Sequence, residues 1–137
     1  MGRVGRDNAM LTVMVNRRYG GFSYSDEAMA EYHKIKPGVE MHEIERHDEV
    51  MVDIVKKMGE KAWGISCEIS FETINEVYRD HYKVDDYDGF ESVRIEYTRY
   101  MIDRIRDIMD NRDFTSEQKV LQIRHVLSSV EYAMRCA

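Results

Sequence analysis

ISCEISFETI (residues 65–74) carries the clearest β-strand pattern in the chain. Apolar side chains alternate with polar ones, which is the period of an extended strand with one face in a hydrophobic core. We expect the apolar set to face that core: Ile65, Cys67, Ile69 and Phe71. A strand of this kind needs hydrogen-bonding partners elsewhere in the sequence.

Two further segments can supply those partners. MLTVMVNRRY (10–19) alternates in the same way before a glycine pair, and VYRDHYKV (77–84) follows the first strand after a short connection. Short connections favour antiparallel neighbours. We therefore predict strands near 10–18, 65–74 and 77–86, with the last two paired.

Two helices are predicted, over residues 25–36 and 48–58. Each opens on a residue whose side chain can accept hydrogen bonds from free backbone amides, Ser25 in the first and Asp48 in the second. The only proline in the chain ends the first helix, and Gly59 ends the second. The combination predicts an α+β fold, in which a small, mainly antiparallel sheet is covered by these helices.

The C-terminal part of the chain has the pattern of a helical hairpin. Apolar residues recur at a spacing of three and four along two stretches, which are Ile95, Thr98, Ile102, Ile105 and Met109, and then Val120, Ile123, Leu127, Val130 and Met134. Thr115 with Gln118 forms a capping box between them. We expect these two seams to pack against each other.

More apolar side chains lie beside the seams than a single hairpin contact uses: Tyr97, Met101, Ile108, Leu121, Val126 and Ala133. One interpretation is that the seams satisfy each other and nothing else binds. The other is that these extra residues form an interface with a protein partner or with a second copy of the chain.

Composition limits the domain organisation and the partners. The chain has 137 residues, 43% of them hydrophobic and 34% charged, which fits an α+β domain over 10–94 with the hairpin, 95–137, packed on it or extending from it. Residues 1–9 are polar and are expected to be a flexible or partner-held arm. The 26 acidic residues outnumber the 20 basic ones, which argues against a general nucleic-acid or anionic-membrane binder.

Neither a membrane segment nor a targeting segment is visible in the sequence. No apolar run approaches the roughly 20 residues that span a bilayer, and no signal-peptide core is present. We therefore expect an intracellular, soluble protein. Cys67 and Cys136 are expected to be a buried thiol and a thiol near the C-terminus rather than a disulfide or a metal site.

Two apparent metal motifs fail on their spacing. In VDDYDGFESVRIE (84–96), an EF-hand register places Asp86 and Asp88 correctly, but its first and last ligand positions hold Val84 and Ile95. Asp88 and the glycine after it predict a tight turn instead. HEIERH (42–47) separates its histidines by five residues, which suits neither a helical nor an extended zinc site. We expect no metal and no cofactor.

RRYGGFSYS (17–25) offers the parts of an anion-binding loop, since a strand, a glycine pair and a helix start follow one another. The acidic residues Asp26 and Glu27 would repel a phosphate at that helix start. A structural turn is therefore favoured. The alternative is a ligand site that combines this loop with the later aspartates: Arg17, Arg18, Gly20, Gly21, Asp86 and Asp88.

Three segments together resemble one group of proteins. VNRRYGGFSYSDEAMAEY (15–32), RHDEVMVDIVKKMGEKAWG (46–64) and DYDGFESV (86–93) are similar, in this order, to motifs of small proteins from phages and large DNA viruses. Departures include Arg18 in place of a cysteine and Glu49 in place of a proline. The resemblance implies a viral context without an established activity, and those proteins commonly lack the C-terminal hairpin.

The most consistent functional prediction is an interaction or assembly protein without catalytic activity. No catalytic dyad, metal cluster or phosphate loop is found in the sequence. The viral resemblance narrows the expectation to a minor virion or capsid-associated component. The alternative is a small-ligand or phosphate-binding protein, or a hydrolase, that uses the RRYGG loop.

Overall fold

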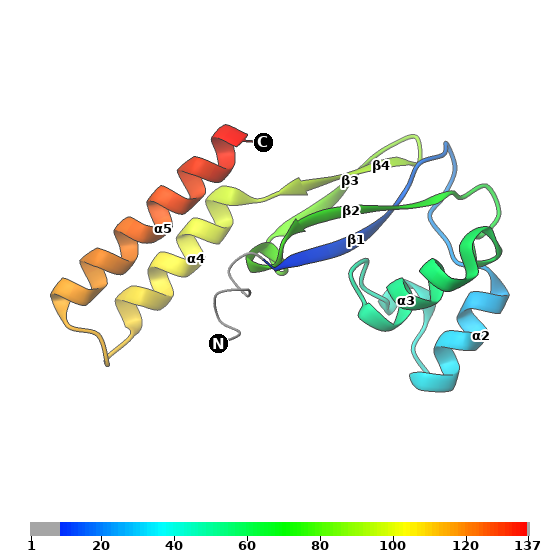
Figure 1. Ribbon diagram of the computed structural model, residues 1–137, viewed down its shortest axis with the longest axis horizontal. Coiled ribbons are helices and arrows are strands. Elements are labelled where there is room, and N and C mark those ends of the chain that lie inside the picture. Colours follow the sequence, from blue (N-terminus) through cyan, green and yellow to red (C-terminus); the bar gives the residue numbers. More distant parts are fainter. Residues whose placement is uncertain (1–8, 137) are drawn as a thin grey trace. The chain divides into compact units, whose positions relative to one another are not determined.

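The computed structural model of the protein describes residues 9–136 and divides the chain into two compact units. The first, residues 1–94, is called the α+β unit below, and the second, residues 95–137, the helical unit. All but the last residue of the expected arm, 1–9, lies outside the described residues. The two units are described separately, and the elements are labelled in Figure 1.

The first sheet of the α+β unit pairs β1 (Met10–Asn16) with β2 (Ile69–Asn75) in antiparallel register. Met10 lies opposite Asn75, and Asn16 lies opposite Ile69. The strand predicted over 65–74 begins later than expected, because Ser66 adopts a positive φ of 60° in a turn. Ile65 is consequently 92% exposed, so its predicted place in the core is wrong.

Two helices and the 3-10 turn that follows them cover one face of this sheet (Figure 1). These are α2 (Asp26–Ile35), α3 (Glu49–Met58) and η2 (Gly59–Ala62). They share a core of twelve buried residues: Met14, Tyr24, Ala28, Tyr32, Ile44, Met51, Val52, Ile54, Val55, Ala62, Cys67 and Ile69. Burial raises the pKa of the Cys67 thiol, as expected for a side chain that serves only packing.

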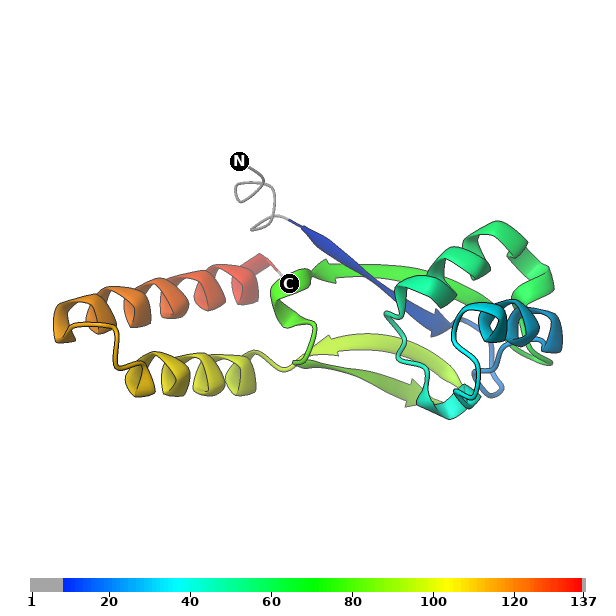
Figure 2. The same cartoon turned by 90° about the horizontal axis from the view of Figure 1, so that it is seen from below.

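The second sheet is a hairpin of β3 (Tyr82–Tyr87) and β4 (Phe90–Ile95). Figure 2 shows the two sheets, β1–β2 and β3–β4, as separate pairs of strands. The two residues between β3 and β4, Asp88 and Gly89, have φ values of 53° and 92°, which confirms the predicted tight turn.

The predicted α+β class is confirmed, but its pairing detail is wrong. The strand predicted over 65–74 pairs with β1, and the one predicted over 77–86 pairs with β4. The 3-10 turn η3 (Glu76–Tyr78) lies between them, where a strand was expected to begin. A further 3-10 turn, η1 (Met41–Glu43), lies between α2 and α3.

Both predicted helix caps are present. Ser25 Oγ accepts a hydrogen bond from the Ala28 amide at 3.1 Å, and Asp48 Oδ1 accepts one from the Met51 amide at 3.0 Å. Asp48 Oδ2 also accepts from the Tyr32 hydroxyl at 2.8 Å. This second bond ties α2 to the first turn of α3.

The Asp48 cap should make stability depend on pH. Burial by itself would raise the pKa of this carboxyl, but the hydrogen bonds from Met51, Tyr32 and Lys36 outweigh it and hold the pKa below the ordinary 3.8. A lowered folded-state pKa stabilises the protein above pH 3.8, and this contribution is lost as the pH falls further. We expect Asp48→Ala to cost about 1–2 kcal/mol at pH 7 and less at pH 3, measured by urea unfolding.

Asp53→Ala is the matched control for this experiment. Asp53 lies on the same helix in an exposed pair with Lys57, at 2.9 Å, and its replacement should change the free energy of unfolding by no more than about 0.5 kcal/mol. A cost at position 48 that is equally large at pH 7 and pH 3 would contradict the assigned role of its charge.

The helical unit consists of α4 (Tyr97–Asp110) and α5 (Ser116–Cys136), which run side by side in opposite directions (Figure 1). The predicted capping box is present, with hydrogen bonds of 2.8 and 3.1 Å between Thr115 and Gln118. In the described part of the chain, no helix is both long and apolar enough to span a bilayer.

Ile123 and Val130 of the second predicted seam lie in the contact between the helices, but the first predicted seam lies mostly outside it. The buried contact between α4 and α5 is formed by Ile108, Val126 and Val130, with further side chains packed around them: Tyr97, Tyr100, Met101, Phe114 and Ile123. In the predicted seam of α4, Ile102 is 49% exposed and Met109 is 55% exposed. The prediction that this stripe packs on α5 is therefore wrong.

Most of the residues predicted as an outer interface lie between the two helices. Ile108 and Val126 are buried between the helices, and Tyr97 and Met101 pack against them, while Leu121 stays exposed. Two apolar stripes of the same period run along α4, one residue apart. Spacing alone does not distinguish the stripe that meets α5 from the stripe that is left open.

Candidate functional site

Asn16, at the end of β1, organises the loop that the sequence analysis singled out. Its side chain is fully buried. Oδ1 accepts hydrogen bonds from the amides of Arg18 and Glu68 at 3.1 and 3.0 Å, and Nδ2 donates to the Arg18 and Gly89 carbonyls at 2.8 Å each. One amide side chain thus closes the RRYGG loop, fixes the start of β2 and holds the β3–β4 turn.

A buried ion pair completes this junction. The Glu91 carboxylate on β4 accepts hydrogen bonds from the two terminal guanidinium nitrogens of Arg46, at 2.6 and 3.0 Å. It also accepts one from the backbone amide of Asn16 at 2.8 Å. The Arg46 guanidinium also lies 3.6 Å from the centre of the Phe22 ring. The backbone amide of Met14 donates to the Arg46 carbonyl, which caps the open edge of β1.

Residues from three segments, 15–32, 46–64 and 86–93, therefore meet in one place. Asn16 and Phe22 come from residues 15–32, Arg46 from 46–64, and Glu91 from 86–93. Because the ion pair and the amide bonds share partners, each segment depends on the other two for its conformation.

The residues of the predicted ligand site lie around this junction, but their charges are already engaged. Arg17 pairs with Glu72 at 2.5 Å and donates to the Glu91 carbonyl at 3.2 Å, and Arg18 lies 3.7 Å from Glu68. An incoming anion would have to compete with both carboxylates for these arginines.

The glycines and aspartates of that predicted site have structural roles here. Gly89 packs its backbone directly against Gly20, leaving no room for a side chain, and the Asp86 carboxylate accepts from the Gly89 amide at 2.5 Å. Asp88 forms the turn, and Gly21 borders open space. The structure thus brings Gly20 and the Asp86–Gly89 turn together, and ligand binding there stays a prediction.

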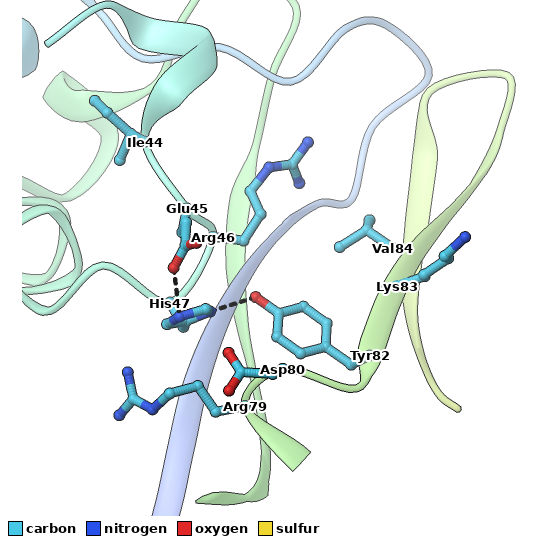
Figure 3. A pocket seen from close by; sticks show the side chains of 9 residues that line it. All are labelled: Ile44, Glu45, Arg46, His47, Arg79, Asp80, Tyr82, Lys83 and Val84. Carbon is cyan, nitrogen blue, oxygen red and sulfur yellow. Dashed lines mark hydrogen bonds and ion pairs between the residues drawn. The ribbon is translucent and has the colours of Figure 1, made fainter. Parts of the chain in front are cut away.

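A polar pocket of about 380 Å³ lies beside the junction (Figure 3). It is lined by Ile44, Glu45, Arg46, His47, Arg79, Asp80, Tyr82, Lys83 and Val84. His47 is buried and sits between two partners, the Tyr82 hydroxyl at 2.6 Å from Nδ1 and the Glu45 carboxylate at 2.7 Å from Nε2. Sequence reasoning examined this histidine only as a zinc ligand and missed Tyr82.

Tyr82, His47 and Glu45 form one row of polar contacts in this pocket. Burial, together with the negative charge of Glu45, raises the pKa of Tyr82 to about 12, so the hydroxyl keeps its proton at neutral pH. The hydroxyl contacts Nδ1 of His47, and the Glu45 carboxylate contacts Nε2 of the same ring. Both ring nitrogens are occupied. The arrangement therefore ties the loop before α3 to β3.

Tyr82→Phe tests this interpretation. Removing the hydroxyl leaves Nδ1 of a buried imidazole without its hydrogen-bond partner, which should lower the free energy of unfolding by about 1–2 kcal/mol in urea titrations. Tyr87→Phe, on the same strand at an exposed position, is the control and should change it by less than about 0.5 kcal/mol. Equal effects of the two variants would show that the contact adds nothing.

Metal binding finds no support in the geometry of the described residues. Across residues 9–136, no three side chains of His, Cys, Asp or Glu come close enough to share an ion. The two arginines that line the pocket around His47 are themselves paired with carboxylates, Arg79 with Glu76 at 3.0 Å and Arg46 with Glu91.

Both helices of the helical unit carry exposed apolar side chains. We call the surface that includes them the open face: Thr98, Ile102, Ile105 and Met109 on α4 with Val120, Leu127 and Met134 on α5. Met101 and Val126 lie in the contact between the helices, and Ile102 and Leu127 are the next residues along the chain. One residue turns an α-helix by about 100°, so on each helix the exposed stripe is rotated by about 100° from the contact, in the sense of the chain. Because the helices are antiparallel, equal rotations bring both stripes to the same side of the hairpin.

A shallow groove of about 490 Å³ runs along this side. It is lined by Met101, Leu127, Val130, Glu131, Met134 and Arg135. Leu127 is 44% exposed even though it borders the buried seam. The open face thus combines apolar side chains on both helices with a groove between Met101 of α4 and the C-terminal part of α5, which is the form of a helix-packing surface.

No protein-family model, curated protein or solved structure matches this chain. The function is therefore argued from the geometry of the molecule.

Proposed function

We propose that the protein is an interaction and assembly protein without catalytic activity, and that the open face of the helical unit is its binding surface. The observation that carries the proposal is the position of Ile102, Met109 and Leu127, which are about half exposed on one side of a two-helix hairpin. Contiguous exposed apolar surface on a small unit typically marks a protein–protein interface.

The α+β unit serves as the folded body in this proposal. Its most elaborate polar contacts, around Asn16 and His47, consist of groups that bind one another, and both nitrogens of the His47 ring are engaged. This arrangement supports a structural role over acid–base chemistry. The RRYGG loop remains the site of the alternative function, phosphate or small-ligand binding, although Arg17 and Arg18 are paired with carboxylates.

The viral resemblance in the sequence supports a narrower form of the proposal, a minor component of a virus particle. Mass spectrometry of purified particles from the source virus tests it directly. We expect this chain at a fixed ratio to the major capsid protein. Its absence from particles, with abundance in infected cells, would refute the virion assignment and leave the interaction role to be tested separately.

Placing charge on the open face should abolish assembly. Ile102→Glu with Leu127→Glu puts two carboxylates where a partner's apolar side chains would lie, and their desolvation should weaken binding by at least about 100-fold. In native extracts of cells that produce the protein, the wild type should run as an assembly and the double variant as a monomer, measured by native electrophoresis or size-exclusion chromatography.

The matched control carries two new carboxylates on the opposite side of the hairpin. His125→Glu with Ser129→Glu changes exposed positions of α5 away from the open face and should leave the assembly intact. Circular dichroism checks that all variants keep their helices. A wild type that runs as a monomer in native extracts would overturn the proposed function.

A further inference from the structure

The small core of the helical unit indicates what kind of partner binds the open face. The unit spans 43 residues, and the contact between its two helices buries three side chains, Ile108, Val126 and Val130. Units of this size rarely have enough core of their own and are commonly completed by oligomerisation. Four helices around one core are the usual way for a hairpin to bury its second apolar stripe.

We infer that the occupant is a second copy of this chain, with α4 packed antiparallel on α4 of the second copy and α5 on its α5, so that the two loops lie at opposite ends of a four-helix bundle. This inference rests on the proposed function, since it names the partner of the same surface. Two-fold pairing of one surface with itself is the commonest form of protein assembly.

The order of charges along the outer edge of α4 determines the direction of pairing. Beside the open face lie Arg99, Asp103, Arg106 and Asp110, whose signs alternate along the helix. About a two-fold axis between residues 104 and 105, Arg99 meets Asp110 of the second copy, and Asp103 meets Arg106. In a parallel pair of α4 helices this edge would instead face the opposite edge of the partner helix, so these four charges would not meet.

The same axis gives complementary charges on α5. Met101 and Val130 line the same groove, so these two residues lie at about the same height in the hairpin. Because the helices are antiparallel, the axis between residues 104 and 105 of α4 then lies level with residues 126–127 of α5. Around that level, Glu117 of one copy approaches Arg135 of the other. Arg135 also forms an exposed pair with Glu131 of its own helix at 3.2 Å, which an incoming carboxylate can share at little cost.

Net charge presents no barrier to this pairing. The helical unit holds seven basic and seven acidic residues, so the whole net charge of −6 belongs to the α+β unit. Two hairpins without net charge approach without overall repulsion. The apolar stripes then meet across the axis, where Ile102 and Ile105 pack on their counterparts.

A charge-swap experiment on the full-length purified protein tests the inference. Arg99→Glu with Arg106→Glu makes the edge of α4 wholly acidic, and Asp103→Arg with Asp110→Arg makes it wholly basic. We expect the wild type to be a dimer by light scattering after size exclusion, and each variant alone to dissociate at least about 100-fold more readily. An equimolar mixture of the two variants should restore the dimer.

His125→Glu with Ser129→Glu again serves as the control and should remain dimeric, and circular dichroism verifies that the helices form in every variant. A dimer that survives both charge variants, or a mixture that fails to restore it, overturns the antiparallel arrangement and hence the inference.

A monomeric wild type at the highest soluble concentration also overturns the inference, and two further measurements then separate it from the proposed function. If assemblies in native extracts still depend on Ile102 and Leu127, a different protein is the partner and the proposed function stands. If the Ile102→Glu and Leu127→Glu changes instead alter hydrogen exchange in residues 10–94, the α+β unit of the same chain covers the face, and both proposals are wrong.

Discussion

Glu91→Gln is expected to lower the free energy of unfolding by about 3 kcal/mol, because it removes the enclosed carboxylate that pairs with Arg46. The Glu91 side chain is almost completely enclosed, and it holds Arg46 by two hydrogen bonds. Glutamine still has an oxygen that can accept from the backbone amide of Asn16. Its NH2 group, however, would face the Arg46 guanidinium, which is also a donor. Urea or thermal unfolding of the full chain measures the change.

Asp85→Asn on the same hairpin is the matched control. Asp85 pairs with Arg94 at 2.8 Å, but both side chains are about half exposed. Exposed pairs contribute little, so this variant should cost less than about 1 kcal/mol. Similar costs for the two substitutions would mean that the Arg46 pair is no more important to stability than a surface contact.

Asn16→Asp should be at least as damaging, with an expected cost of about 3–4 kcal/mol, even though the two side chains have the same shape. Nδ2 of Asn16 donates to the Arg18 and Gly89 carbonyls, and an aspartate places a buried negative charge against both of them. The same charge would lie next to Glu91. Loss of these bonds should free the RRYGG loop and the β3–β4 turn together.

Asn75→Asp controls for the chemistry of the substitution. Asn75 lies at the other end of the β1–β2 ribbon, and its Oδ1 accepts from the Val77 amide at 3.0 Å, a role that aspartate can fill. We expect a cost below about 1 kcal/mol there. Hydrogen exchange should show faster opening at Arg18 and Gly89 in the Asn16 variant alone, and unchanged exchange at these amides would contradict the assigned role of Asn16.

Local features of the fold were predictable from neighbouring residues. The caps at Ser25 and Asp48, the box formed by Thr115 and Gln118, and the turn at Asp88 are all as expected. Each depends on a side chain and a backbone amide within three residues of each other. Such contacts form whatever the rest of the chain does, which is why the sequence reveals them.

Much of the candidate site was not predictable in this way. The bond between the Asn16 amide and Glu91 joins residues 75 positions apart, and the pair of Arg46 with Glu91 joins residues 45 apart. Neither glutamate nor asparagine at those positions stands out from other polar residues on a strand. His47 and Tyr82 become a pair only once β3 lies beside the loop before α3.

The sequence by itself determined the α+β class, the places of α2 and α3, and the existence of a C-terminal helix pair, since the periods of two and of 3.6 residues are set by the backbone of each segment. Tertiary structure alone decided which strands pair, because the edge of β2 can accept any strand with a matching pattern and only the packing of the whole unit selects β1. It also decided which of two equally periodic stripes on α4 meets α5, since a helix presents both at once and only the partner's surface distinguishes them.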